Sequence, residues 1–241
     1  MRVSRIFTRQ ILAAGATVNL EQRPAHYLSQ VLRLRSGDKI VLFDGSGGDF
    51  QAELTRCDRK ACIARIASLT RQEQPTELQL HLGIGVSRGE RMDFVIQKSV
   101  ELGVTAITPL LTERSLVQFR SDRREKRMSH WQGVLLSACE QSGRSLIPTL
   151  HSPAALPDWF VAHRNGLMLD HRVTRTLPEL PHPGMSLNLL VGPEGGLSQA
   201  ERWQASAAGF TAVRLGPRVL RTETAPLAAL AAIQVLWGDL R

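Results

Sequence analysis

Apolar residues follow strand spacing and helical spacing in turn from about residue 78 onward. Alternate residues are apolar through 78–86, as in a half-buried strand, and apolar residues then recur at helical spacing up to Gly103. A long helix is predicted at 121–142, and further strands at 186–191 and 211–215. Alternation of this kind predicts an α/β domain in which helices cover both faces of a parallel sheet.

Polar residues that favour helix starts precede three of the helical segments. Ser198 and Glu201 have the spacing of a capping box. Thr222 is expected to cap the apolar helix that ends near Trp237, and Ser87, together with Glu90, is expected to cap the helix that follows 78–86.

The chain before about Thr76 has a different pattern, which predicts short strands. These are expected at 31–35, 39–43, 52–55 and 62–66, and the glycines of 44–49 suit a hairpin turn. We interpret this part as a small β-barrel. The polar segment 71–76, which includes Pro75, is the expected linker. The predicted domains are therefore residues 1–72 and 77–241.

The positive charge of the chain is carried almost entirely by arginine. Thirty Lys and Arg against 22 Asp and Glu give a net charge of +8. Up to Thr76 there are 12 basic and 7 acidic residues, so the smaller part is the more densely basic one. Arginine suits phosphate, so a polyanionic partner is favoured over a merely solvated arginine-rich surface.

Three cysteines, Cys57, Cys62 and Cys139, show no zinc-ligand spacing, and we expect reduced thiols in a cytoplasmic protein. No apolar run is long enough to span a membrane, and the first residues do not resemble a signal peptide. No metal site is expected.

Two glycine-proline segments follow predicted strands of the larger part, at 191–198 and 215–225. Ligands bind at such places in open α/β sheets, and glycines let the backbone approach a flat ligand closely. A tight strand-to-helix turn also needs glycine. Two such loops at matching places nevertheless favour a ligand site.

A possible nucleophile motif is found at 85–89, where Gly-Val-Ser-Arg-Gly matches the elbow of α/β-hydrolases. Asp158 or Asp170, followed by His171 or His182, would complete the order of a triad. A hydrolase is therefore the alternative function, although the large sheet that should precede such a serine is missing. A dinucleotide fingerprint fails, because Arg88 stands where its third glycine should be.

A basic cluster lies at 113–127, where six positive residues occur together with three acidic ones, Glu113, Asp122 and Glu125. Charge runs at helix starts are usually solvated faces, so phosphate contact is only mildly favoured here. The positive residues are Arg114, Arg120, Arg123, Arg124, Lys126 and Arg127.

Segments in order along nearly the whole chain resemble the 16S ribosomal RNA uracil-N3 methyltransferase family, a branch of the SPOUT superfamily. The matching stretches are Leu32-Arg, Leu42-Phe-Asp-Gly, the run 87–104, Ile107-Thr-Pro-Leu, Glu113-Arg-Ser, Ala138-Cys-Glu-Gln-Ser-Gly-Arg, 191–198 and 215–225. The resemblance implies a PUA-like RNA-binding β-barrel and a C-terminal parallel sheet with a trefoil knot. It also implies a homodimer that binds S-adenosylmethionine and acts on 16S ribosomal RNA or the small ribosomal subunit.

The same resemblance implies that the two glycine-proline loops hold the cofactor, with a third wall near Leu169 and Asp170. The expected cofactor-binding residues are Leu169, Gly192, Pro193, Glu194, Gly195, Gly196, Leu197, Leu215, Gly216, Pro217, Val219, Leu220 and Thr224.

Methylation at N3 requires the loss of a weakly acidic proton, and negative charge then spreads over the uracil oxygens. A guanidinium would stabilise that charge, and a carboxylate of raised pKa would accept the proton. The catalytic candidates are Arg221, Glu223, Glu140 and Arg144. For Glu223 the alternative to a catalytic role is a purely structural one, because it lies near a helix start and complements the dipole there. Arg221, likewise, would only brace the loops if it paired with Glu194 or Glu223.

Contacts are expected with RNA and with a second copy of the chain. The candidates for RNA binding are Arg2, Arg5, Arg33, Arg35, Arg88 and Arg114. The alternative for several of these is mere exposure to solvent. The helix at 225–237 is apolar on more than one face, as in a dimer interface, although burial within its own domain explains the pattern equally well. An RNA-binding module without catalysis is a third possible function.

Overall fold

The computed structural model describes residues 3–115 and 121–240, with the side chains of 121–123 left out. The chain forms two compact units. The first contains Met1–Pro75 and Cys139–Ile147, and the second contains Thr76–Ala138 and Pro148–Arg241. The first unit therefore includes a segment far along the chain, which the sequence did not predict.

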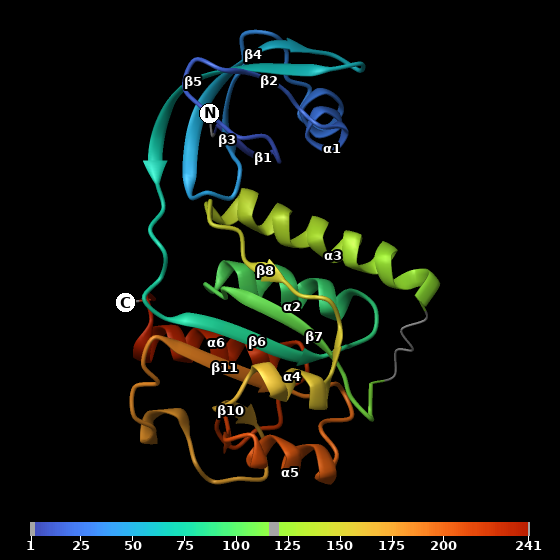
Figure 1. Cartoon of the computed structure of the whole chain (residues 1–241), viewed down its shortest axis with the longest axis vertical. Coiled ribbons are helices and arrows are strands. Elements are labelled where there is room, and N and C mark those ends of the chain that lie inside the picture. The colour runs from blue at the N-terminus through green and yellow to red at the C-terminus, as the bar shows by residue number, and fades with distance from the viewer. Residues whose placement is uncertain (1–2, 116–120, 241) are drawn as a thin grey trace. The chain divides into compact units, whose positions relative to one another are not determined.

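The first unit is built on a five-stranded sheet (Figure 1). The strand order is β1-β3-β4-β5-β2; β1 is parallel to β3, and the other pairs are antiparallel. Buried side chains such as Leu28, Ile40 and Leu54 form its core. Its elements are β1 (Ser4–Phe7), β2 (Thr17–Asn19), α1 (Gln22–His26), η1 (Tyr27–Val31), β3 (Lys39–Phe43), β4 (Gly48–Cys57) and β5 (Cys62–Gln72).

The strand predicted at 31–35 is wrong. The chain is helical through α1 and η1, and Leu28 is fully buried while Leu32 packs on the same core one turn later. Arg33 then has a φ of +55°, in the left-handed region, so the chain turns before β3 instead of running extended.

The prediction of three reduced thiols is wrong for Cys57 and Cys62, which form a disulfide. They are register partners at the end of the β4–β5 hairpin, with 4.1 Å between their Cα atoms. Cys139 is a buried free thiol, and burial raises its pKa to about 12, so it stays protonated and unreactive.

A buried carboxylate, Asp49, ties the end of the long helix α3 (Ser121–Ser142) into the first unit. Its Oδ1 accepts a hydrogen bond of 2.6 Å from Arg5, its Oδ2 accepts one of 2.9 Å from Arg71, and the Ser145 hydroxyl donates to it as well. Burial raises the pKa of Asp49, but the hydrogen bonds from Arg5 and Ser145 outweigh it and leave that pKa below its usual value. These contacts explain why Cys139–Ile147 groups with the N-terminal sheet.

The second unit contains a seven-stranded sheet in which every pairing is parallel, which confirms the predicted α/β class. The order is β12-β10-β11-β6-β7-β8, with β9 also paired to β7. The strands are β6 (Gln79–Gly85), β7 (Ala106–Leu111), β8 (Thr149–Leu150), β9 (Ala154–Ala155), β10 (Gly166–Leu169), β11 (Ser186–Val191) and β12 (Phe210–Val213).

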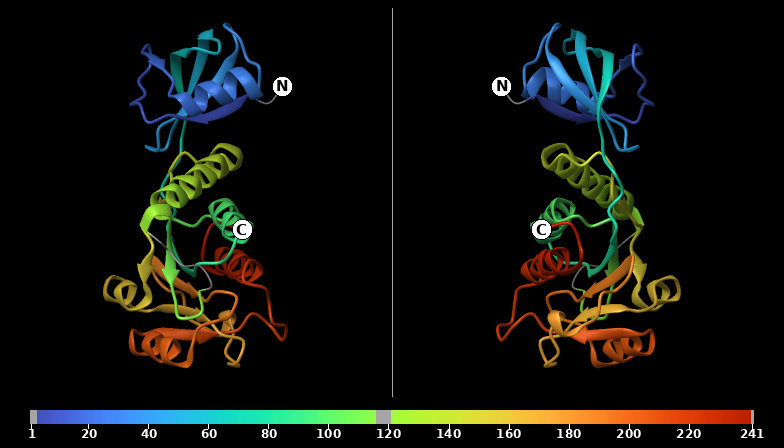
Figure 2. Two further views of the ribbon diagram at one scale, coloured as in Figure 1. Left: turned by 90° about the vertical axis from the view of Figure 1, so that its right-hand side faces the viewer. Right: turned by 90° about the vertical axis from the view of Figure 1, so that its left-hand side faces the viewer.

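Helices cover both faces of this sheet (Figures 1 and 2). α4 and α5 lie on one face, where Trp159 and Ala205 join a core cluster with strand residues such as Leu190. α2 and α6 pack together on the other face. The remaining elements are α2 (Glu90–Glu101), α4 (Leu156–Ala162), η2 (Leu177–Glu179), α5 (Gln199–Ala207) and α6 (Thr224–Trp237).

Of the three predicted caps, only the capping box of α5 is confirmed. The Ser198 hydroxyl accepts from the backbone N–H of Glu201, and the Glu201 carboxylate accepts from that of Ser198. The other two are wrong, because Gly89 precedes α2 and Glu223 precedes α6, and neither helix has a side-chain cap.

Within the described parts of the chain, no helix is long and apolar enough to cross a membrane. The same residues contain no group of His, Cys, Asp or Glu side chains able to hold a metal ion.

We predict that stability falls with acidity because of His81, on β6. Its Nε2 lies 2.7 Å from the Thr108 hydroxyl, and His151 stacks on its ring. Burial, followed by the neighbouring His163 and His151, lowers the pKa of His81 to about 3. The unfolded chain therefore binds a proton near pH 6.5 that the folded chain excludes. Stability due to neutral His81 is complete above that pH and is lost below it, by up to about 1.4 kcal/mol per pH unit.

Denaturant unfolding of the wild type and of His81→Gln at pH 7, 6 and 5 checks this prediction. The variant should lose less stability on acidification than the wild type. If the free energy of unfolding fell equally with pH in both proteins, the prediction would be contradicted, even if the two proteins differed by a constant amount.

Candidate functional site

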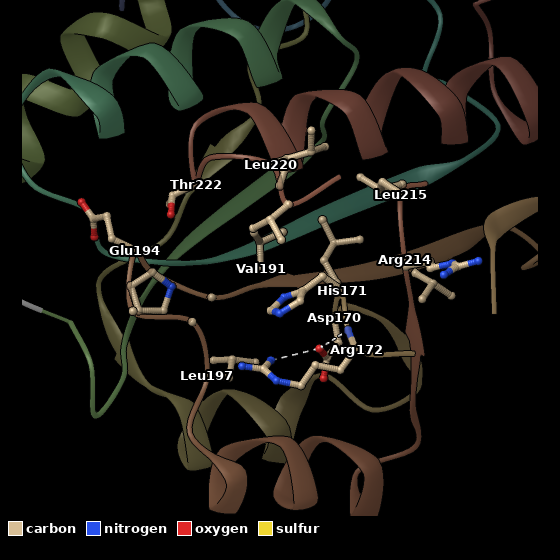
Figure 3. A pocket seen from close by; sticks show the side chains of 18 of the residues that line it. Asp170, His171, Arg172, Val191, Glu194, Leu197, Arg214, Leu215, Leu220 and Thr222 are labelled. Carbon is tan, nitrogen blue, oxygen red and sulfur yellow. Dashed lines mark hydrogen bonds and ion pairs between the residues drawn. The ribbon is translucent and has the colours of Figure 1, made fainter. Parts of the chain in front are cut away.

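A cavity of about 220 Å³ lies in the second unit at the carboxyl ends of β10, β11 and β12 (Figure 3). Because these strands are neighbours and parallel, the loops that follow them meet at one edge of the sheet. Loop 170–172 follows β10, loop 192–197 follows β11 and loop 214–222 follows β12, and residues of all three line the cavity.

Most of the predicted cofactor residues line this cavity. They are Leu169, Gly192, Pro193, Glu194, Gly195, Gly196, Leu197, Leu215, Gly216, Val219 and Leu220. Pro217 and Thr224 are not among the lining residues, and Thr224 is exposed at the first position of α6.

Sequence reasoning missed several polar residues of the wall, four of them arginines. The cavity is also lined by His171, Arg172, Arg202, Arg214, Arg218 and Thr222. His171 and Arg172 fall in a weakly patterned stretch, and Arg202 comes from α5, so only the alternation of strands and helices pointed to them.

Asp170 organises one side of the cavity (Figure 3). It is 8% exposed and lies 3.1 Å from Arg172 and 3.5 Å from Arg202. The Arg214 Nε atom is also buried here, and the described residues give it no hydrogen-bond partner. One of the lining residues therefore has a buried donor without a partner, which is rare in folded proteins.

Glu194 provides negative charge on the opposite side of the cavity (Figure 3). Its Oε1 accepts from the backbone N–H of Arg88 at 3.1 Å and from Arg91 at 3.0 Å. Burial raises the pKa of Glu194, but these hydrogen bonds outweigh it and hold the pKa below its usual value. Its Oε2 is buried without a partner among the described residues. The cavity therefore contains an ionised carboxylate with one unsatisfied oxygen.

Arg91, at the start of α2, joins the two glycine-proline loops. It lies 3.0 Å from Glu194, in the first loop, and 3.8 Å from Glu223, which follows the second. Arg221 was the candidate for this brace, but its side chain is exposed and pairs with no carboxylate among the described residues. The bracing contact therefore belongs to Arg91.

Close backbone approach fixes the first loop against β6. A Cβ on Gly85 would lie 2.5 Å from Pro193, so no larger residue fits there without moving the loop. Arg114 holds the far side of the loop, since its Nη1 donates to the Gly195 carbonyl at 2.9 Å. A Cβ on Gly195 would meet the Arg114 side chain at 3.0 Å, so a substitution there disturbs this brace first.

Two of the catalytic candidates, Glu140 and Arg144, belong to the first unit. The Glu140 carboxylate accepts from the backbone N–H of Phe7 at 3.2 Å and lies 3.5 Å from Arg23. Burial raises the pKa of Glu140 above its usual value despite Arg23. Arg144 lies 4.0 Å from Glu73. Their catalytic roles stay predictions.

The predicted RNA-binding arginines have different surroundings. Arg2 lies outside the described residues. Arg5 is held inside its unit by Asp49, Ser145 and the Cys139 carbonyl, and its guanidinium stacks on Phe43, which gives it a structural role. Arg33, Arg35, Arg88 and Arg114 are exposed, and Arg114 also donates to the Gly195 carbonyl. Their role in RNA binding stays a prediction.

The hydrolase alternative lacks the contact that it needs. Ser87 is 4% exposed, and its Oγ has no hydrogen-bond partner in the described part of the chain. A nucleophilic serine must bond a general base. Asp170 and His171 instead line the cavity described above, whose wall does not include Ser87.

Comparison with known families agrees with this architecture. A family model described as an RNA methyltransferase domain matches residues 73–234, and one described as an RNA methyltransferase PUA domain matches 21–67. The parallel sheet with its glycine-rich cavity and the smaller N-terminal unit together define an RNA methyltransferase.

The particular family follows from whole-chain relatives. Ribosomal RNA small subunit methyltransferase E of Buchnera aphidicola (subsp. Schizaphis graminum) is 34% identical over 99% of this chain and 98% of its own. The Bacillus subtilis protein of that name is 28% identical, over 96% of each chain. This chain belongs to the ribosomal RNA small subunit methyltransferase E family.

Solved structures give the same result. A Neisseria gonorrhoeae ribosomal RNA small subunit methyltransferase E bound to S-adenosylmethionine has a TM-score of 0.92 and 40% identity, over the whole of both chains. A Legionella pneumophila methyltransferase in complex with the same cofactor has a TM-score of 0.96 and 37% identity, with the same coverage.

We predict that the capping box of α5 stabilises the end of the first loop. Ser198 is buried, and Glu201 also accepts from the backbone N–H of Glu113 at 2.9 Å. Ser198→Ala should lower the free energy of unfolding by about 1 kcal/mol, the usual cost of a lost N-cap. Ser206→Ala, at an exposed site on the same helix, is the control in denaturant unfolding. Equal effects of the two substitutions would contradict a capping role.

Proposed function

We propose that this protein transfers a methyl group from S-adenosylmethionine to N3 of a uridine in 16S ribosomal RNA of the small subunit. The observation that carries the proposal is the cavity of two braced glycine-proline loops with unsatisfied Glu194 and Arg214 atoms. Relatives named as ribosomal RNA small subunit methyltransferases, one of them solved with the cofactor, support it. A cytoplasmic location is part of the proposal, because the RNA substrate is there.

The residues of the cavity suit S-adenosylmethionine. This ligand has a carboxylate at one end and positive charge on its amino group and sulfur. Arginines such as Arg214 suit the carboxylate, while the free Glu194 Oε2 suits the positive groups. Backbone groups of 192–197 and 215–220 would hold the adenine. When bound, the cofactor supplies an electrophilic methyl group.

The chain's own residues must then handle charge and a proton on uracil. Arg221 follows the second loop and is not tied to another side chain of the described residues, so its guanidinium is available to the uracil oxygens. Glu140 and Glu223 are the candidates for taking the N3 proton. The raised pKa of Glu140 suits a general base, since a base of higher pKa accepts a proton more readily.

We further propose a barrel in the first unit, a trefoil knot in the second and a homodimer. The dimer is supported by α6, where an apolar groove includes Ala231, Ala232, Val235 and Leu236. Val235 is 55% exposed and Leu236 is 39% exposed. Exposed apolar surface of this kind favours a protein interface.

The dimer predicts a species of twice the chain mass in equilibrium sedimentation at micromolar concentration. Val235→Glu should shift this equilibrium toward monomer, because charge is costly at an apolar interface. A stable 26.7 kDa species in the wild type would contradict the dimer.

The function itself is tested by mass spectrometry of 16S ribosomal RNA from a deletion strain. One N3-methyluridine should be absent and should return when the wild-type gene is expressed. An unchanged set of methylated nucleotides in the deletion strain would overturn the proposal.

We predict that Arg221 serves turnover and not cofactor affinity. Arg221→Ala should keep the affinity for S-adenosylmethionine and the melting temperature, because Arg91 makes the bracing contacts. The single-turnover methylation rate should fall by roughly 100-fold, the scale of one lost electrostatic donor. A near-normal rate at saturating cofactor and RNA would contradict the catalytic role.

A further inference from the structure

A second cavity lies beside the start of α2 in the same unit, and the proposed function does not use it. Its volume is about 420 Å³, and its wall includes Ser87, Arg88, Gly89, Arg127 and His130. It shares no lining residue with the cofactor cavity. The two cavities are nevertheless neighbours, because the Arg88 backbone N–H donates to Glu194, which lines the first.

Ser87 is the feature of this cavity that requires explanation. It is 4% exposed, and its hydroxyl has no partner among the residues that the structure describes. A buried hydroxyl without a partner loses its hydrogen bonds to water and gains none in return, so such groups are rare in folded proteins. A ligand in the cavity that Ser87 lines would provide the missing partner.

The start of α2 adds donors beside Ser87. The helix has 12 residues, and Gly89 precedes it with a φ of +60° and no side-chain cap. The first backbone N–H groups of a helix lack partners within it, and they favour anions. An uncapped helix start next to an unsatisfied hydroxyl therefore suits a ligand rich in acceptor oxygens.

The charged side chains around the cavity are of both signs. Arg88 and Arg127 supply positive charge, while Glu90 and Asp93 are the acidic residues of the wall. Asp93 lies 2.7 Å from His130 Nε2, so its carboxylate already has a hydrogen-bond partner. A phosphate group accepts from hydroxyl, backbone N–H and guanidinium together.

We propose that this cavity binds a phosphodiester group of the RNA strand that carries the methyl acceptor. The inference rests on the proposed function, and it adds the place where the strand is held beside the cofactor cavity. Ser87 and Arg127 act as positioning residues, because they bind the backbone of the substrate and not the reacting base.

Binding of the full-length protein to small ribosomal subunits from the deletion strain tests this proposal. Affinity is measured between 50 and 200 mM salt for the wild type, Ser87→Ala, Arg127→Gln and, as control, Arg164→Gln. Arg164 is exposed and follows α4, at the opposite edge of the sheet.

Ser87→Ala should weaken RNA binding by about tenfold while the melting temperature stays the same or rises, because an unsatisfied hydroxyl is removed. Arg127→Gln should weaken binding and lower the slope of log affinity against log salt by about 0.7–0.9, as expected for one lost phosphate contact. Cofactor affinity should not change in either variant, and Arg164→Gln should match the wild type.

Wild-type affinity and salt slope in both Ser87→Ala and Arg127→Gln would overturn the proposal. Addition of inorganic phosphate at constant ionic strength distinguishes a site for free phosphate from a site for RNA. If it raises the melting temperature of the wild type but not of Ser87→Ala, while RNA affinity is the same in both, the cavity takes free phosphate and the RNA proposal is wrong. This experiment measures RNA binding, whereas the proposed function is tested by the methylation of 16S ribosomal RNA. A failure of the proposed function is therefore distinguishable from a failure of this inference.

Discussion

Parallel pairing of β10 with both β11 and β12 is the constraint on which the site depends. Met168 is the register partner of Leu190 on one side and of Ala212 on the other, so the three strands end together. The loops that follow are far apart in the chain but meet at one sheet edge. Without this register, the two glycine-proline segments would be ordinary turns.

Charge then fixes the loops relative to each other. Arg91 contacts Glu194 and Glu223, and Arg114 contacts the Gly195 carbonyl, so the cavity wall is braced from outside. Two residues of the wall, Glu194 and Arg214, keep a carboxylate oxygen and a guanidinium nitrogen without partners among the described residues. Unsatisfied buried groups are rare in folded proteins, and the binding of a ligand is one explanation for them.

Much of the second unit could be predicted from the sequence, because its strands are buried and its helices amphipathic. The strand 186–191 and the helix 121–142 were predicted at their observed bounds. The glycine-proline loops were recognisable because glycine is required where backbone approaches backbone, as at Gly192, where a Cβ would lie 2.9 Å from the backbone nitrogen of Leu197.

Other features depend on contacts that no local pattern contains. Residues 31–35 alternate like a strand, yet the core position of Leu28 and the turn at Arg33 make this region helical and irregular. The disulfide between Cys57 and Cys62 follows from hairpin register, and the inclusion of Cys139–Ile147 in the first unit follows from the Asp49 network. The role of Arg91 was missed for the same reason, since its partners lie more than 100 residues away.

The central claim is that the braced cavity of the second unit binds S-adenosylmethionine, and calorimetric titration of the full-length protein tests it most directly. The account predicts saturable binding by the wild type and affinity weaker by at least about tenfold in Glu194→Gln, since one charge-assisted contact contributes about 1.5–3 kcal/mol. Glu101→Gln, which alters a carboxylate paired with Lys98 at the far end of α2, should bind as the wild type does. No binding by the folded wild type, or equal affinity in Glu194→Gln and Glu101→Gln, would contradict the account.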